Sequence, residues 1–154
     1  MTHVDVRVST TIARPRAAVA AYAADPDNAP EWYANIDSAQ WRTPKPLAVG
    51  SEIDFRARFL GRGLAYTYRV EEYVPGERLV MATAQGPFPM RTTYIWADAG
   101  AAGGPATRMA LRNDGSPRGF AAIIAPLMEA LMRRANTKDL VRIKEILEAS
   151  PAGG

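Results

Sequence analysis

The chain has 154 residues, with 19 Lys and Arg against 16 Asp and Glu, one His and no Cys, so its net charge is +3. This length favours a single domain with a substantial core. The absence of cysteine excludes disulfides, iron–sulfur clusters and thiol nucleophiles, and one histidine cannot anchor a standard metal site. We therefore expect neither a metal nor a cofactor. The arginines are interleaved with acidic residues, so the positive charge does not indicate nucleic-acid binding.

Neither a signal peptide nor a membrane-spanning segment is recognisable, because the first residues are polar and no run of 18 apolar residues follows. We expect a cytoplasmic protein without stable membrane association, acting as a monomer or homodimer. Residues 1–149 are expected to form one domain and residues 150–154 a flexible tail.

The first third of the chain predicts one strand and two short helices. Valines alternate with polar residues over 4–12, which indicates a strand with one buried face. Pro15 suits the first turn of an Ala-rich helix ending at residue 24. A second short helix is predicted over 27–34, followed by a strand over 36–43.

The middle of the chain predicts a series of antiparallel strands. Ile53, Phe55, Ala57 and Phe59 alternate with charged residues, and the glycines around residue 62 supply a tight turn into a partner strand over 64–70. A Pro-Gly pair at 75–76 suits a type II turn. Further strands are expected over 78–85, 88–97 and 107–111, which gives about seven strands in all.

The last third predicts a long helix. Ser116 can cap it, apolar residues recur at helical spacing as far as Leu147, and Pro126 predicts a bend over 122–126. The apolar stripe rotates along this helix. We therefore expect one half of the helix to roof a cavity and the other half to pack against the sheet.

This order of elements is that of the helix-grip fold, and the sequence resembles the START-like, or SRPBCC, superfamily. It is most similar to the polyketide cyclase/dehydrase and lipid-transport branch, through VRVSTTIARPRAAVAAYAADPDNAPEWYANI, VGSEIDFRARFLGRG, YRVEEYVPGERLV and NDGSPRGFAAIIAPLMEALMRRANTKDLVRIKEILE. The resemblance covers about residues 4–148. It implies an α+β fold in which a curved antiparallel sheet wraps around the C-terminal helix and encloses an apolar cavity. It is specific for the fold and not for an activity.

The inward-facing side chains of this fold are the predicted ligand-binding residues. They are Phe55, Phe59, Tyr66, Tyr68, Met81, Thr83, Met90, Thr92, Tyr94, Met109 and Leu111 from the sheet, and Phe120, Ile124 and Met128 from the helix. An aromatic and methionine-rich lining suits a lipid, a polyketide or an aromatic metabolite. The alternative is that these side chains fill a solid core. The three tyrosines favour a cavity, because a buried phenol needs a hydrogen-bond partner.

Three functions remain open from the sequence. The first is carrying or sequestering a hydrophobic small molecule, and the second is a metal-free polyketide cyclase, aromatase or dehydratase using the same pocket. The third is an interaction domain, against which the charged outer face at Glu52, Asp54, Arg56 and Arg58 argues. No residue is assigned as catalytic. A buried acid or base with a perturbed pKa in the cavity would distinguish the enzyme from the carrier.

Two further groups of polar residues are given structural interpretations. Asn113 and Asp114 are expected to make the turn before the long helix, with binding at the cavity mouth as the alternative. The charged residues of that helix, among them Arg134, Lys138 and Asp139, are expected to form a solvated face rather than a surface for membranes or nucleic acid.

Overall fold

The computed structural model describes residues 3–59, 61–85, 89–100, 103–116, 123 and 125–149. Seven strands form one antiparallel sheet in the order β1-β7-β6-β5-β4-β3-β2. Their bounds are β1 Val4–Ile12, β2 Ile36–Trp41, β3 Glu52–Phe59, β4 Arg62–Val74, β5 Arg78–Gln85, β6 Met90–Asp98 and β7 Thr107–Gly115. The first strand therefore lies at one edge of the sheet, beside the last.

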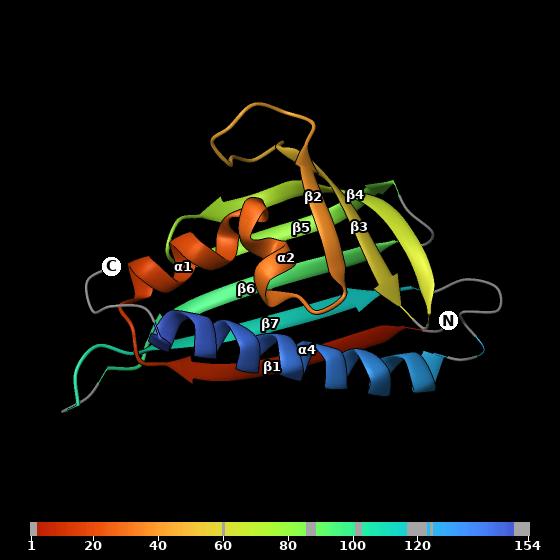
Figure 1. Cartoon of the computed structure of the whole chain (residues 1–154). Helices are drawn as coiled ribbons and strands as arrows, with labels where there is room; N and C mark the ends of the chain where they lie inside the picture. Colours follow the sequence, from red (N-terminus) through yellow and green to blue (C-terminus); the bar gives the residue numbers. More distant parts are fainter. Residues whose placement is uncertain are drawn as a thin grey trace.

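The helices α1 (Arg16–Ala24), α2 (Ala29–Trp32) and α4 (Ala125–Ala149) all lie on one face of the curved sheet (Figure 1). A short 3₁₀ turn, η1 (Pro26–Asn28), joins α1 to α2. The long helix α4 runs along β1, so the first strand and the last helix of the chain pack together (Figure 1). These features confirm the predicted α+β helix-grip fold.

The hairpin of β3 and β4 follows from the alternation of apolar and charged residues in both strands. Phe55 pairs with Tyr66 and Ile53 with Tyr68 across the hairpin. Gly61 has φ of 74°, a conformation that costs a glycine little and other residues more. The ladder of β4 and β5 contains two register shifts, after Thr67 and after Val70. Such bulges bend and twist a strand, which helps to curve the sheet around the helices.

Two local details differ from the sequence predictions, and others cannot be compared. Pro15 stands at the N-cap of α1 and not inside its first turn. The second helix divides into the 3₁₀ turn and a four-residue helix, and Trp32 at its end is only 1% exposed. The predicted bend over 122–126 falls mostly outside the described residues, as do the turn over 117–120 that Ser116 was expected to cap and the tail over 150–154.

The two halves of α4 have different surroundings, as its rotating apolar stripe predicts. Leu140, Ile143 and Leu147 are buried in the main hydrophobic core together with residues of α1 and the sheet. Met128 and Met132, nearer the start of the helix, line an internal cavity. The second half of α4 therefore packs against the main core. The first half faces the cavity on one side and packs against Val4 and Val6 of β1 through Ala125.

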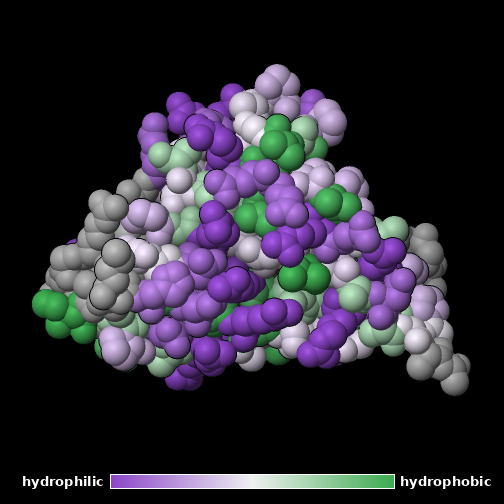
Figure 2. All heavy atoms as spheres, turned by 180° about the vertical axis from the view of Figure 1, so that it is seen from behind, coloured by the Kyte–Doolittle hydropathy of each residue, from purple (hydrophilic) through white to green (hydrophobic). Residues whose placement is uncertain are grey.

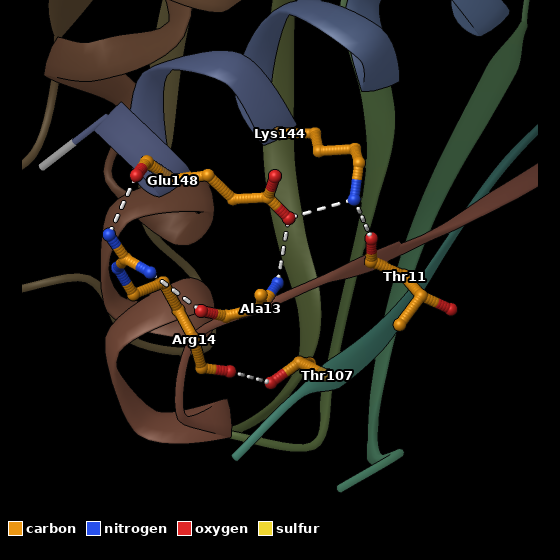
Figure 3. A network of polar contacts seen from close by, with 6 residues as sticks. All are labelled: Thr11, Ala13, Arg14, Thr107, Lys144 and Glu148. Atoms are coloured by element: carbon orange, nitrogen blue, oxygen red, sulfur yellow. Dashed lines mark hydrogen bonds and ion pairs between the residues drawn. The ribbon is translucent and has the colours of Figure 1, made fainter. Parts of the chain in front are cut away.

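A network of polar contacts fixes the C-terminal end of α4 to the end of β1 (Figure 3). Glu148 Oε2 accepts hydrogen bonds from the backbone N–H of Ala13 at 2.8 Å and from Lys144 Nζ at 2.7 Å. Lys144 Nζ also donates to the carbonyl of Thr11 at 2.5 Å, and Arg14 Nη2 donates to the carbonyl of Glu148 at 2.7 Å. Charge-assisted bonds of this kind are about twice as strong as neutral ones.

The outer face of the sheet is mainly hydrophilic, with apolar residues scattered among charged ones (Figure 2). Ion pairs cross its strands: Arg112 to Asp5 at 2.7 Å, Arg69 to Glu52 at 2.6 Å and Arg91 to Glu71 at 3.4 Å. This pattern agrees with the ion-paired, solvated face expected from the sequence and gives no support to an apolar interaction surface there. No helix in the described part of the chain has the length and hydropathy of a membrane span.

The contacts of Glu148 predict that Glu148→Gln lowers the free energy of unfolding by about 1 kcal/mol at pH 7. The pKa of Glu148 is lowered by its hydrogen bonds with Lys144 and the Ala13 backbone. Its contribution is therefore present above the ordinary glutamate pKa and is lost as the pH falls through the lowered value. Urea unfolding at pH 7 and pH 3 measures both effects, with Glu145→Gln, at an exposed position, as the control. An equal loss at the two pH values would contradict the assignment.

Candidate functional site

A cavity of about 690 Å³ lies between the inner face of the sheet, the α1–α2 segment and the first half of α4. Most of the predicted ligand-binding residues line it: Phe55, Tyr66, Tyr68, Met81, Thr83, Met90, Thr92, Tyr94 and Met128. The alternation of the strands therefore brings together side chains from β3, β4, β5 and β6 and places them opposite the helix.

The other predicted residues lie elsewhere or outside the described part of the chain. Met109 and Leu111 are fully buried in the core cluster that also contains Val19 of α1, and they do not line the cavity. Phe120 and Ile124 are outside the described residues, as is the side chain of Phe59, whose backbone belongs to β3.

Three aromatic rings form one wall of the cavity. The ring centroid of Phe55 lies 5.6 Å from that of Tyr66 and 5.9 Å from that of Tyr68, and the two tyrosine rings are 5.1 Å apart. These separations are within the range in which aromatic pairs attract one another. The wall offers a flat or apolar molecule a firm surface, and the nearby methionines can adapt to its outline.

A chain of hydrogen bonds runs from this wall to β7. The Tyr68 hydroxyl lies 2.7 Å from Thr92 Oγ1, which donates to Asn113 Oδ1 at 2.5 Å. Because the threonine hydrogen goes to Asn113, the tyrosine donates to the threonine. Burial raises the pKa of Tyr68 to about 12, so the phenol keeps its proton at neutral pH.

A second polar pair is formed by the hydroxyls of Tyr33 and Tyr94, which share a hydrogen bond. Tyr33 follows α2, where the buried Trp32 anchors the segment and its ring contacts that of Tyr33 at a centroid distance of 4.0 Å. Burial raises the pKa of both tyrosines above the ordinary value. Both phenols are therefore hydrogen-bond donors or acceptors and not bases at neutral pH.

Helix α4 contributes a buried carboxylate to the cavity. Asp139 is 3% exposed, and its Oδ1 accepts a hydrogen bond from the backbone N–H of Ala34 at 3.0 Å. Burial raises the pKa of Asp139 to about 6, although the Ala34 bond acts in the opposite direction. One turn earlier, Asn136 is 6% exposed and also lines the cavity.

The mouth of the cavity is basic. Arg58 and Arg62 both line the cavity and are both exposed, so they lie where it meets solvent. Arg58 also lines an adjoining hollow of about 300 Å³ with Arg134 and Lys138. The Arg58 guanidinium forms an ion pair with Asp37 at 3.2 Å. Arg58 therefore departs from the expectation that its strand places it wholly on the outer, solvated face.

Two further expectations from the sequence are corrected by the structure. Asn113 belongs to β7, which continues to Gly115, and its side chain faces the cavity instead of making a turn. Asp139 is buried in the cavity wall and does not belong to a solvated face. A helical repeat could have indicated this, because Met128, Met132, Ala135 and Asp139 recur at spacings of about one turn. The predictions used that repeat only for apolar residues.

The raised pKa of Asp139 leads to a prediction about stability. The pKa of Asp139 is higher in the folded protein than in the unfolded chain. Below about pH 4 the carboxyl is protonated in both states and does not lower the free energy of unfolding. Stability is lost as the pH rises through about 6. Asp139→Asn keeps the acceptor for Ala34 and removes the buried charge. We expect it to raise the free energy of unfolding by about 2 kcal/mol at pH 7.5 and to have little effect at pH 4. Denaturant titrations at both values, with the exposed Asp98→Asn as control, measure this; no gain at pH 7.5 would refute it.

Comparison with known structures shows the same fold in other proteins. The Zhui aromatase/cyclase from Streptomyces sp. R1128 is 16% identical, with a TM-score of 0.79 over 99% of both chains. A protein of Thermus thermophilus, TTHA0849, is 16% identical, with a TM-score of 0.74 over 95% of this chain and 99% of the other. A START superfamily protein from Mycobacterium smegmatis is 11% identical, with a TM-score of 0.74 over 92% of this chain and 98% of the other.

The search of curated proteins finds no match to the sequence. The model of one protein family, described as polyketide cyclase/dehydrase and lipid transport, matches residues 3–148. The match spans every strand described above and all but the last residue of α4. The chain therefore belongs to the polyketide cyclase/dehydrase and lipid transport family.

Proposed function

We propose that the protein binds a hydrophobic small molecule in the cavity between the sheet and α4, in order to carry or sequester it. The observation that carries this proposal is the cavity itself. Its volume of about 690 Å³ lies within the range of small-molecule sites, which is about 300–1,000 Å³. Protein interiors seldom leave voids larger than a water molecule. A solid core therefore accounts poorly for these side chains.

The lining supports a ligand that is mostly apolar with a few polar groups. Phe55, Met81, Met90 and Met128 offer apolar contact. The hydroxyls of Tyr33, Tyr68 and Tyr94 are grouped in the two hydrogen-bonded sets described above. Such a distribution is typical of sites in which apolar area supplies affinity and a few polar atoms fix orientation. A lipid, a polyketide or an aromatic metabolite would fit this description.

A second candidate function is a metal-free cyclase, aromatase or dehydratase acting on a polyketide-like chain in the same cavity. Asp139 is the observation that favours it, since a buried carboxyl with a pKa of about 6 is suited to proton transfer near neutral pH. In this scheme the Asp139 carboxylate takes a proton from the carbon beside a ketone. The enolate carbon then attacks a second carbonyl of the same chain, and the proton returns to the new alkoxide.

The proposed setting is the cytoplasm, with a single chain or a homodimer as the binding unit and without nucleic acid or stable membrane association. Cell fractionation and the mass of the native protein test these points separately from ligand binding.

Blocking the cavity is expected to abolish ligand binding. Ala135 of α4 lines the cavity, so Ala135→Phe places a ring inside it. We expect native mass spectrometry of the wild type to reveal a co-purified hydrophobic molecule, or an added fluorescent hydrophobic probe to bind at micromolar concentrations, and both signals to fall at least tenfold in the variant. Ala97→Phe, on the exposed part of β6, is the control. Equal binding by both variants, or no binding by the wild type, would contradict the proposal.

Proton exchange distinguishes the carrier from the enzyme. A catalytic base would speed the exchange of the methyl protons of 2-acetylnaphthalene for deuterium, which proton NMR follows directly. If Asp139 is that base, Asp139→Asn should slow the catalysed exchange about 10²-fold or more while ligand binding persists. A wild type that binds the ketone without accelerating exchange would leave the carrier as the function.

A further inference from the structure

Three cationic side chains line a hollow beside the mouth of the cavity. This hollow of about 300 Å³ adjoins the cavity, since Asn35, Arg58 and Ala135 line both spaces. Its charged lining residues are Arg58, Arg134 and Lys138, and no carboxylate is among the described residues that line it. All three cationic residues are exposed. The hollow therefore carries a positive charge that its own lining does not neutralise.

Most of these cations lack a partner, in contrast to the paired arginines of the outer sheet face. Arg58 forms an ion pair with Asp37, but the side chains of Arg134 and Lys138 form neither an ion pair nor a hydrogen bond in the described part of the chain. The same holds for Arg62 at the cavity mouth. Arg134 and Lys138 are four residues apart on α4, a spacing at which like charges destabilise a helix. An anion bound between them would offset this repulsion.

The acidic residues of the cavity do not line the hollow. Asp139 is buried in the cavity wall, and Asp25 lines the cavity while its Oδ1 accepts a hydrogen bond from the backbone N–H of Asp27 at 3.0 Å. An anionic group of a ligand inside the cavity would face these carboxylates in a low-dielectric space. The same group in the hollow would face the three cations. The charges therefore favour an apolar part inside and an anionic part at the exit.

We infer that the ligand is an amphiphile whose apolar part occupies the cavity while its anionic group, a carboxylate or a phosphate, binds in the hollow to Arg58, Arg134 and Lys138. Carboxylates and phosphates are the anions whose geometry matches the arginine side chain. Arg62 adds positive charge at the mouth, between the two parts of such a molecule. The inference rests on the proposed function and adds to it a ligand class and an orientation.

Four ligands with the same ten-carbon chain test the inference: decanol, decanoate, decyl phosphate and decyltrimethylammonium. Calorimetric titration at low salt is expected to show that the wild type binds each anion about tenfold more tightly than decanol, since a pair of exposed charge contacts is worth about this factor. The cationic compound should bind most weakly. Because the hollow is open to solvent, the preference for the anions should shrink when the salt is raised from about 20 mM to about 500 mM.

Paired substitutions separate the hollow from the net charge of the protein. Arg134→Gln/Lys138→Gln should lose the preference for the anions and bind decanol as the wild type does, which also shows that the variant is folded. Arg7→Gln/Arg56→Gln is the matched control, because it removes two exposed charges from β1 and β3 that do not line the hollow. This control should keep the preference. Arg134→Glu/Lys138→Glu should reverse it and bind decyltrimethylammonium more tightly than decanoate.

The outcomes distinguish the inference from the function on which it rests. If the wild type binds none of the four compounds, the proposed cavity function fails. If decanol binds as tightly as the two anions at low salt, or if the hollow variant and the control variant behave alike, the anionic ligand is overturned and the cavity function stands. If inorganic phosphate alone binds as tightly as decyl phosphate, the hollow is a site for a free anion, and the orientation of an amphiphile is overturned.

Discussion

The site depends on where the tight packing of α4 against the sheet ends. Beyond Leu140 the helix is buried against the main core, and the contacts of Lys144 and Glu148 hold its last turns to the end of β1. Before Asp139 the helix continues along β1, where Ala125 packs with Val4 and Val6, and another side of it, with Met128 and Met132, faces the cavity. One helix therefore closes the core at its C-terminal end and lines the cavity nearer its start.

Two polar groups of that space lower the stability of the fold. The charged form of Asp139 is destabilised by its burial, and the Asn136 donor has no partner in the described part of the protein. Natural proteins depart from well-satisfied cores mainly at functional sites. The two residues share one wall of the cavity, where the Ala34 backbone donates to Asp139.

The sequence predicts which side chains face inward where the alternation of residues along a strand decides it. Alternation in β3 to β6 places Phe55, Tyr68 and Tyr94 on the inner face, and the structure agrees. The same alternation holds for Leu111, but whether an inner-face residue meets the core or the cavity depends on which helix covers it, and no repeat contains that information. Asp139 was missed for a related reason. Charges surround it along the helix, and the one signal of its burial is its place in the helical repeat of Met128, Met132 and Ala135.

The pairing of the first strand with the last, covered by the final helix, has a consequence for synthesis of the chain. Bonds such as that from Ala13 to Glu148 join residues 135 positions apart. Contacts so distant in sequence form late, because a long loop must close first. On the ribosome, β1 has no neighbouring strand until β7 emerges, and the aromatic inner face has no roof until α4 follows. The nascent protein therefore displays its future binding surface to its surroundings through most of translation, and it hides that surface only when α4 is complete.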